Sequence, residues 1–452
     1  MAYRSGGRGG RGGRGGRGRG GGRGRGGGRG AAGKPLVQPC RNFLTTGNCK
    51  HTGRCSFKHV VQLHKSLINS NVNPSDQNSY QHNSYDRGYD NRNNYNNKNK
   101  SKYFSTTDVA LWNDPSAGVL KIFTSSHDGL WRLYNTGSGF SKEIEHDMGG
   151  QINSILVESN FLFCGFEGKA VKVPACNVGM IFAWNLGNPG DPPIEFHMHE
   201  TAPYAHVKGV TCFITNGDMC VSGGRDSIIR IWKYDTGVSQ KGGFKLLQTL
   251  CGHVGEVTGL LIVGSMLWSC STDMTIRLWD SSANWECKFL ITQGQVPQGN
   301  HNALPPAATP DGINSGHTDA ITGLLNFKSD AGDFVLTSSL DGTIKVWNST
   351  NGECLSTTEN GIGIISMALS ADTKGSAILL CGTKDGKILI RSLQQTAKVP
   401  PMSFLCSLDY DFLQVGHEAP VKRIISGPSN TFYSVGDDGK LVIWQFTGDF
   451  DL

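Results

Sequence analysis

The chain has 452 residues, of which 37% are hydrophobic and 18% charged, with a formal net charge of +6 at pH 7. This length leaves room for two or three units. Residues 1–65 carry 15 Lys or Arg and no Asp or Glu, whereas residues 101–452 carry 24 basic and 34 acidic residues. The asymmetry points to a polyanionic partner for the basic end. With no run of 18 apolar residues and no apolar N-terminal segment, the sequence predicts neither a membrane span nor a signal peptide.

Thirteen cysteines are present, and three of them cluster before residue 60. The other ten lie mostly inside apolar, strand-like runs: Cys164, Cys176, Cys212, Cys220, Cys251, Cys270, Cys287, Cys354, Cys381 and Cys406. This is not the spacing of a disulfide framework, and buried free thiols suit a reducing compartment. We therefore expect an intracellular protein, in the nucleus first and in the cytoplasm as an alternative.

Residues 1–34 are almost entirely Arg and Gly, and the arginines include Arg8, Arg11, Arg14 and Arg17. Such a segment has no apolar surface to bury, so we expect disorder. Arginine pairs with phosphates and stacks on bases, and Arg-Gly segments occur among single-strand binders. A solubilising tail or a site of arginine methylation is the alternative.

Residues 35–65 contain four candidate metal ligands with the spacing Cys-x8-Cys-x5-Cys-x3-His: Cys40, Cys49, Cys55 and His59. Three thiolates and one imidazole complete a tetrahedral shell for one structural Zn²⁺, with no open position for chemistry. The segment is too short and too polar for a core, so the metal would supply most of its folding free energy. His51 and His64 are rival ligands, but only His59 completes the spacing.

Basic and aromatic residues lie between these ligands. Those expected to contact nucleic acid are Arg41, Phe43, Lys50, Arg54, Phe57 and Lys58. The cations suit phosphates, and an aromatic ring beside a zinc site can stack on an unpaired base. The alternative for the two phenylalanines is that they form the small core of the finger.

The segment resembles the CCCH zinc fingers of RNA-binding proteins. It shares their Cys-Arg-x-Phe start at residues 40–43, Gly-x-Cys-Lys at 47–50 and Cys-x-Phe-x-His at 55–59. It departs from them at His51, where an aromatic is common, and at residues 34–39, which lack the Arg/Lys-Tyr-Lys-Thr lead of AU-rich-element binders. The resemblance thus implies RNA binding without naming the RNA. Residues 66–100, rich in Asn and Tyr, are expected to be a disordered linker, either a plain spacer or a segment that supports condensation.

A repeat begins near residue 103. Its copies have small residues, an Asp in a turn and then an alternating apolar strand: 125–134, 222–232, 269–279, 337–347, 381–391 and 434–444. A Trp follows the Asp by six residues in four copies, and a His precedes it by 20 to 24 residues in the same four. Residues 164–173 form a seventh, degenerate copy with Glu167 in place of the Asp.

This pattern resembles the WD40 repeat, which implies an all-β, seven-bladed propeller over residues 101–452. The resemblance implies structural hydrogen-bonded sets rather than catalytic ones, in which a buried indole and imidazole find partners. Their members are His206, Asp226, Trp232, His253, Ser271, Asp273, Trp279, His317, Asp341, Trp347, His417, Asp438 and Trp444. We expect residues 102–106 to supply the outer strand of blade seven, and residues 293–315 to form a surface insertion.

We find no phosphate-binding glycine loop in a strand-to-helix context, no paired carboxylates and no open metal site, so the sequence does not predict an enzyme. It predicts a zinc-dependent nucleic-acid-binding adaptor in which residues 1–65 bind RNA and the propeller recruits proteins. The alternatives are DNA binding and a protein-only scaffold such as a ubiquitin-ligase substrate receptor. The repeat endings WKYD, WDSS, WNST and WQFT lack the basic fourth residue of such receptors. The whole arrangement resembles the plant zinc-finger CCCH and WD-repeat family.

Overall fold

The computed structural model describes residues 61–63, 68–69, 104–170, 173–237, 242–293, 315–329, 332–393, 404–408 and 416–447. The chain divides into two compact units, Met1–Leu36 and Val37–Leu452, and all described residues belong to the second. Among them, the only helical elements are the short 3-10 helices η2 (Thr136–Ser138) and η3 (Ser281–Ala283), and the rest of the regular structure is β-strand. The all-β class predicted from the sequence is confirmed.

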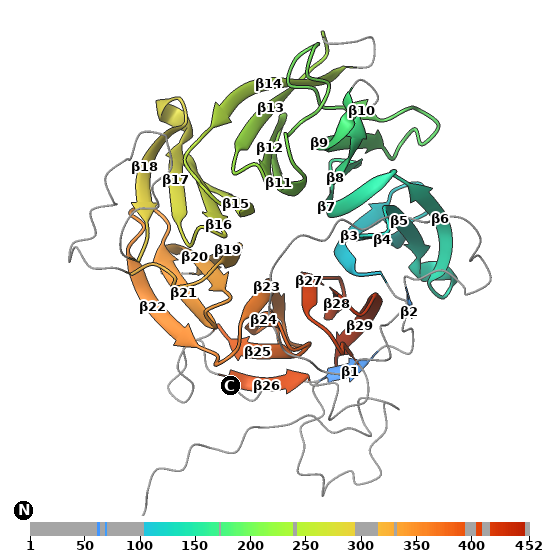
Figure 1. Cartoon of the computed structure of the whole chain (residues 1–452). Helices are drawn as coiled ribbons and strands as arrows, with labels where there is room; N and C mark the ends of the chain where they lie inside the picture. The colour runs from blue at the N-terminus through green and yellow to red at the C-terminus, as the bar shows by residue number, and fades with distance from the viewer. Residues whose placement is uncertain are drawn as a thin grey trace, which may run out of the picture. The chain divides into compact units, whose positions relative to one another are not determined.

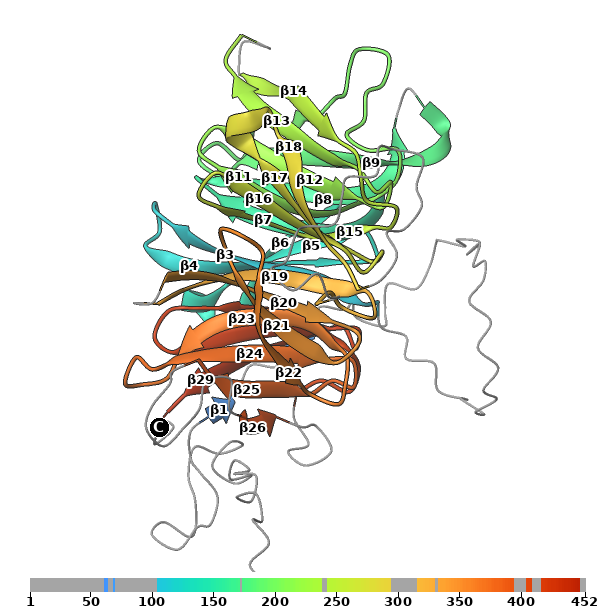
Figure 2. The same cartoon turned by 90° about the vertical axis from the view of Figure 1, so that its left-hand side faces the viewer.

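Seven antiparallel sheets follow one another along the chain, and each is a blade (Figure 1). Each blade begins with its inner strand, and the inner strands contact one another in succession until the last meets the first. Figure 2 shows the same blades from the side of the ring. The predicted seven-bladed propeller is therefore confirmed.

The first three blades run from residue 106 to residue 250. Blade one comprises β3 (Thr106–Asp114), β4 (Val119–Ser126), β5 (Leu130–Asn135) and β6 (Ser141–Asp147). Blade two comprises β7 (Gly150–Glu158), β8 (Phe161–Ala170), β9 (Val173–Asn185) and β10 (Ile194–Glu195). Blade three comprises β11 (Val210–Asn216), β12 (Met219–Gly224), β13 (Ile229–Asp235) and β14 (Gly243–Leu250).

The next three blades run from residue 257 to residue 408. Blade four comprises β15 (Val257–Val263), β16 (Met266–Ser271), β17 (Ile276–Asp280) and β18 (Glu286–Ile291). Blade five comprises β19 (Ile321–Ser329), β20 (Gly332–Ser339), β21 (Thr343–Asn348) and β22 (Cys354–Glu359). Blade six comprises β23 (Ile364–Ala371), β24 (Ala377–Thr383), β25 (Ile388–Ser392) and β26 (Phe404–Leu408).

Blade seven is closed by a segment from far upstream. Its first three strands are β27 (Val421–Ser426), β28 (Thr431–Gly436) and β29 (Lys440–Phe446). Strands β1 (Val61–Leu63) and β2 (Ile68–Asn69) both pair with β29 in antiparallel register. Figures 1 and 2 both place β1 beside this blade.

The expected closure by residues 102–106 is therefore wrong. Thr106 begins the inner strand of blade one, where it pairs with Ser126, and the edge of β29 is taken by β1 and β2. Two residues of the expected 66–100 linker, Ile68 and Asn69, are thus strand residues that pair with Leu441 and Lys440.

The strands are buried according to their place in the blade. The second strands β12, β16 and β28 each show one intermediate residue followed by five buried ones, because both of their faces meet neighbouring blades. The outer strand β14 alternates between exposed and partly buried residues, as expected for a sheet edge with one wet face. The repeat copies seen in the sequence fall on the second strand, its turn and the third strand of each blade, which are the most buried parts.

The hydrophobic core is a set of clusters between neighbouring blades. The cluster that closes the ring packs Val109, Ile122 and Tyr134 of blade one against Val435 and Ile443 of blade seven. Hydroxyl groups add hydrogen bonds between inner strands, because Thr322 Oγ1 in β19 donates to the Ile364 carbonyl in β23 over 2.8 Å. The ring is thus joined by both apolar packing and backbone-directed hydrogen bonds.

The sequence analysis expected free cysteines buried inside strands, and the structure agrees with this in part. The buried free cysteines are Cys164, Cys220, Cys270, Cys287 and Cys381, whereas Cys176 and Cys251 are exposed.

Residues 294–314 of the expected insertion lie outside the described residues. No helix in the described ranges has the length and apolar character needed to cross a bilayer.

Candidate functional site

Blade three contains the hydrogen-bonded set expected from the repeat. Nδ1 of His206 lies 2.9 Å from Oδ1 of Asp226, and Nε2 lies 2.8 Å from Ser222 Oγ. The Trp232 indole donates to the same Ser222 oxygen over 2.9 Å. Arg230 Nη1 lies 2.8 Å from the same Nδ1 and donates to Asp226 Oδ2 over 3.0 Å, so a guanidinium, an imidazole and a carboxylate meet at this point. The set joins the loop before β11 to strands β12 and β13.

Blade four repeats this geometry with a different serine from the one predicted. Trp279 Nε1 donates to Ser269 Oγ over 2.9 Å, and His253 Nε2 lies 2.8 Å from the same oxygen. The prediction of Ser271 was wrong, because Ser271 Oγ instead accepts the Asp273 N–H over 3.1 Å. Ser269 is opposite Arg277 in the β16–β17 register, two residue pairs from Leu267 and Trp279, so its side chain is on the same face of the sheet as the indole and within its reach.

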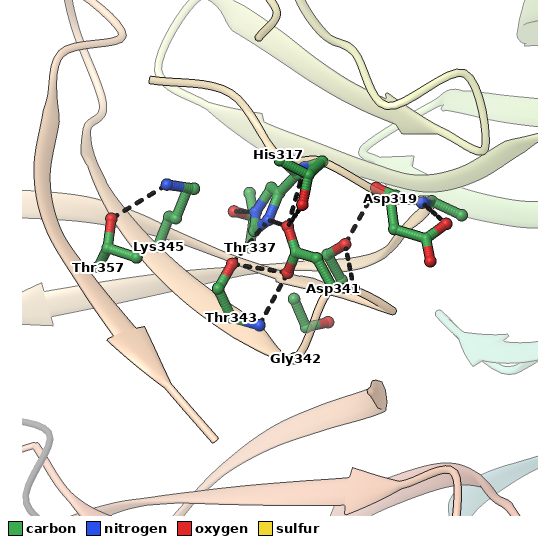
Figure 3. A network of polar contacts seen from close by, with 12 residues as sticks. His317, Asp319, Thr337, Asp341, Gly342, Thr343, Lys345 and Thr357 are labelled. Carbon is green, nitrogen blue, oxygen red and sulfur yellow. Dashed lines mark hydrogen bonds and ion pairs between the residues drawn. The ribbon is translucent and has the colours of Figure 1, made fainter. Parts of the chain in front are cut away.

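Blades five and seven complete the series. In blade five, His317 Nδ1 lies 3.0 Å from Asp341 Oδ2, and its Nε2 lies 2.6 Å from the Thr337 hydroxyl (Figure 3). The Thr337 hydroxyl accepts a hydrogen bond from the Trp347 indole. In blade seven, the equivalent members are His417, Ser434, Asp438 and Trp444. In all four blades the hydroxyl residue precedes its Trp by ten positions. That constant offset is the sequence signal that would have identified Ser269.

These sets resemble a Ser-His-Asp triad, but no substrate can reach them. Ser222, Ser269, Thr337 and Ser434 have no exposed surface. The same arrangement also recurs in four blades, which favours a structural role. The sets hold each loop His and each turn Asp against the two central strands of a blade.

Burial favours the neutral form of the set histidines in blades three, four and five. It lowers the pKa of His206, and the hydrogen bond and charge of Asp226 do not offset this. The same cause lowers the pKa of His253 and His317. Burial alone would raise the pKa of Asp226, but the hydrogen bond from His206 and the Arg230 charge outweigh it and hold that pKa at about 2. In these three blades a neutral imidazole therefore contacts a carboxylate.

Blades one and six stabilise the turn by other means. In blade one, the Arg132 guanidinium bridges Asp128 over 2.9 Å and Glu145 over 2.8 Å. In blade six, the Thr383 hydroxyl donates to Asp385. These two blades lack the loop His of the other four, so the turn Asp accepts from nearer partners.

In blades three, four, five and seven the turn Asp and the loop His meet at one edge of the blade. We call this surface the turn face and define it by residues 206–208, 225–227, 253–256, 272–274, 317–319, 341–342, 417–418 and 437–439. Charged side chains connect blades across it, because Arg225 lies 3.1 Å from Glu167 of blade two and 3.6 Å from Glu256 of blade four. Burial raises the pKa of Glu256, and Arg225 only partly opposes this effect. The turn face is the candidate interaction site of the described residues.

The residues predicted to bind metal or nucleic acid lie outside the described residues. They are the ligands Cys40, Cys49, Cys55 and His59, and the residues Arg8, Arg11, Arg14, Arg17, Arg41, Phe43, Lys50, Arg54, Phe57 and Lys58. Their donor set, three thiolates and one imidazole, fits a structural Zn²⁺. Within the described ranges, no group of three or more His, Cys, Asp or Glu side chains is arranged to hold a metal. In the segment 195–201, His197 Nε2 lies 3.1 Å from Glu195 Oε2, and His199 Nδ1 lies 2.8 Å from the Thr201 hydroxyl.

Comparisons with known proteins agree with both modules. Residues 37–61 match the family described as zinc finger C-x8-C-x5-C-x3-H type, and residues 198–233, 244–280 and 309–348 match WD domain, G-beta repeat. The chain is 25% identical over 412 residues to zinc finger CCCH domain-containing protein 17 of Oryza sativa subsp. japonica, which covers 91% of this chain and 73% of the rice protein.

Two further relatives match over shorter ranges. Zinc finger CCCH domain-containing protein 62 of Arabidopsis thaliana is 32% identical over 165 residues, 36% of this chain and 34% of that protein. Nuclear distribution protein PAC1-2 of Uncinocarpus reesii is 32% identical over 165 residues, 36% of this chain and 33% of that protein. The chain thus spans about a third of the length of each of these two relatives.

The predicted resemblance is confirmed: the chain combines a CCCH zinc-finger sequence with WD40 repeats and is similar to plant CCCH zinc finger proteins. The finger sequence indicates zinc and nucleic-acid binding, and the repeats indicate a scaffold for protein interactions.

Proposed function

We propose that the protein is a zinc-dependent adaptor that binds single-stranded RNA through residues 1–65 and recruits protein partners through its propeller. The division of charge carries this proposal, since residues 1–65 hold 15 basic and no acidic residues while residues 101–452 hold 24 basic and 34 acidic ones. The basic arm suits a polyanion, and the acidic ring would repel one. The protein has no enzymatic activity in this proposal.

One zinc ion per chain folds the finger. Cys40, Cys49, Cys55 and His59 would hold it, and the ion would supply the folding free energy that so short and polar a segment lacks. With the finger folded, Phe57 would offer a ring for stacking on an unpaired base while Lys58 and Arg41 contact phosphates. The preference for RNA over DNA rests on this stacking, because phosphate contacts do not distinguish the two.

Fluorescence anisotropy with matched RNA and DNA oligonucleotides tests the proposal. The full chain should bind single-stranded RNA, with an affinity that falls steeply between about 50 mM and about 200 mM salt. Cys49→Ala should weaken binding by unfolding the finger. The matched control is Cys176→Ala, which removes an exposed thiol of the propeller and should leave binding unchanged.

Three results would contradict the proposal. Equal binding of RNA by residues 101–452 and by the full chain would place the site on the propeller. Tighter binding of the DNA oligonucleotide would favour the DNA-binding alternative. If neither oligonucleotide binds, a protein-only scaffold such as a ubiquitin-ligase substrate receptor becomes the better description. Metal analysis of the purified chain should give one zinc per molecule.

We also propose a nuclear location, with the cytoplasm as the alternative. The free thiols at described positions, such as Cys220 and Cys270, suit a reducing compartment, and an arm for RNA suits the place where RNA is made. Imaging of the tagged full chain checks this, and a signal confined to the cytoplasm would contradict it.

A further inference from the structure

Met274 adopts a backbone conformation that its side chain disfavours. Its φ is 66°, in the turn that follows Asp273. Gly129, Gly342, Gly386 and Gly439 follow the turn Asp in four other blades, with φ between 71° and 88°. A methionine in the left-handed region costs free energy that glycine avoids. The fold therefore does not require a methionine at position 274. Met274 is also 43% exposed.

The residues that follow the loop histidines give a second comparison between blades. The backbone N–H at this position donates to the turn Asp from Val207, Val254, Thr318 and Glu418 alike. Because the backbone makes the structural contact, the side chain is free to vary. Blades three and four have an exposed valine at this position, since Val207 is 53% exposed and Val254 is 45% exposed. Blades five and seven have polar residues there.

Among the residues of the turn face, the exposed large apolar ones therefore belong to two neighbouring blades. Val254 and Met274 flank the same turn, since the Val254 N–H donates to Asp273 over 2.9 Å and Asp273 directly precedes Met274. Val207 makes the equivalent contact with Asp226 over 3.0 Å. The two turns are linked by Arg225 of blade three and Glu256 of blade four, 3.6 Å apart.

Carboxylates border this apolar surface. Arg225 is shared between Glu167 and Glu256, and the positive charge of Lys422 also acts on Glu256. Glu256 lies next to the Met274 turn, because its carbonyl accepts the Thr272 N–H over 2.9 Å. The side chains of Glu167 and Glu256 are 24% and 34% exposed. Both carboxylates can therefore attract a cation of a partner from solvent.

We infer that Val207, Val254 and Met274 form a docking surface for a short linear segment of a protein partner, with an aliphatic side chain next to a Lys or Arg. The inference rests on the proposed recruitment of proteins by the propeller and assigns it to blades three and four. The aliphatic side chain would pack on the two valines and Met274, while the cation would pair with Glu256 and Glu167. Three side chains are too small an apolar surface for a globular interface, so a peptide-sized partner fits better.

Panning a phage-displayed library of random dodecapeptides on the full zinc-loaded chain tests the inference. The enriched peptides should carry an aliphatic residue beside Lys or Arg. A synthetic peptide from this set should bind about tenfold more weakly to Val254→Thr and to Met274→Gly, which replace the apolar groups by residues found in other blades. Glu256→Gln should weaken binding more at low salt than at high salt. The matched control is Leu247→Thr, which removes a 53% exposed aliphatic from β14 and should change nothing.

The outcomes separate this inference from the proposed function. If peptides are enriched but bind all variants equally, the propeller recruits partners elsewhere and only the inference fails. If no peptide is enriched, recruitment of linear segments fails as well. Enrichment of acidic peptides, or loss of RNA binding in Met274→Gly, would also overturn the inference. So would a dimer in sedimentation that dissociates in Met274→Gly, because the occupant would then be a second copy of the chain.

Discussion

Asp108 Oδ1 in β3 lies 3.4 Å from Arg423 Nε in β27, so a charge pair connects the first inner strand of the ring to the last. The other carboxylate oxygen accepts the Ser154 hydroxyl and the Ile155 N–H of blade two, each over 3.0 Å. One side chain therefore contacts three blades at the point where the ring closes. Burial raises the pKa of Asp108 despite the nearby Arg423 charge, so the carboxylate is held there at an electrostatic cost that its partners only partly offset.

Asp108→Ala is expected to lower the free energy of unfolding by about 2–4 kcal/mol, because the Ser154 and Ile155 donors lose their partner in a buried place. Urea denaturation followed by tryptophan fluorescence measures the change. The control is Glu158→Ala, an exposed carboxylate of β7. A loss no larger than that of the control would show that the closure does not depend on Asp108.

Ser269→Ala and Ser271→Ala distinguish the observed hydrogen-bonded set from the one predicted from the sequence. Removing the Ser269 hydroxyl leaves the Trp279 indole and His253 Nε2 without their partner, which should cost about 2–3 kcal/mol. Ser271 Oγ accepts the Asp273 N–H, so its loss should cost about 1 kcal/mol. Equal losses in denaturant unfolding would contradict the assignment of Ser269.

The stability of the ring should fall on mild acidification. Burial lowers the pKa of His206, His253 and His317 in the folded chain, while in the unfolded chain these groups titrate near pH 6.5. Below about pH 6.5 the unfolded chain therefore binds more protons than the folded chain. The contribution of these histidines to the free energy of unfolding is fully present above that pH and is lost as the pH falls. The Asp226 pKa of about 2 acts in the same direction at lower pH.

Urea midpoints at about pH 7.5 and about pH 5.5 measure this effect. His253→Gln should reduce the difference between the two midpoints. His146→Gln, at an exposed position of β6, serves as the control and should preserve it. A midpoint that rises on acidification would mean that the buried histidines are charged in the folded chain.

Residues 61–69 should contribute to the stability of the ring. Comparison of chains that begin at residues 1, 61 and 70 isolates the pairing of β1 and β2 with β29. The chain that begins at 70 should lose about 1–3 kcal/mol relative to the one that begins at 61, because it leaves β29 as an unpaired edge. If the two shorter chains unfold together, the closing strands add no stability.

Met274→Gly is expected to raise the free energy of unfolding by about 0.5–1 kcal/mol, since glycine adopts a φ of 66° without strain. Met274→Ala is the matched control: it removes the exposed side chain but keeps the strained backbone, and should leave stability nearly unchanged. Thermal unfolding of the three chains provides the measurement. A destabilised glycine variant would show that the Met274 side chain serves the fold.

The repeat made the architecture predictable because its constraints are local. An Asp in the turn and a Trp six residues later, as in Asp273 and Trp279, lie in the turn and the second strand of one hairpin, so their spacing is visible in the sequence. The serine was misplaced because Ser269 and Ser271 occupy the same strand two residues apart and face the same side. The constant offset of ten residues before the Trp would have separated them.

The closing strand was not predictable in the same way. Residues 61–63 and 102–106 can each add a strand to an open edge, and local pattern does not decide which of them reaches β29. The choice is made by long-range pairing, in which Val61 and Leu63 are opposite Phe446 and Trp444. The finger lies outside the described residues, so its metal and RNA contacts stay predictions.

This pairing places a described strand directly after the predicted zinc ligands in the sequence. His59, the last predicted zinc ligand, precedes Val61 by two residues, so their Cα atoms are at most about 7.6 Å apart. A free 35-residue linker would instead separate finger and ring by roughly 30 Å on average. The chain pairs with the ring at Asn69, opposite Lys440, and enters blade one at Thr106. The last predicted zinc ligand is therefore within two residues of a strand of blade seven, and its distance from that strand does not depend on the length of the Asn-rich segment.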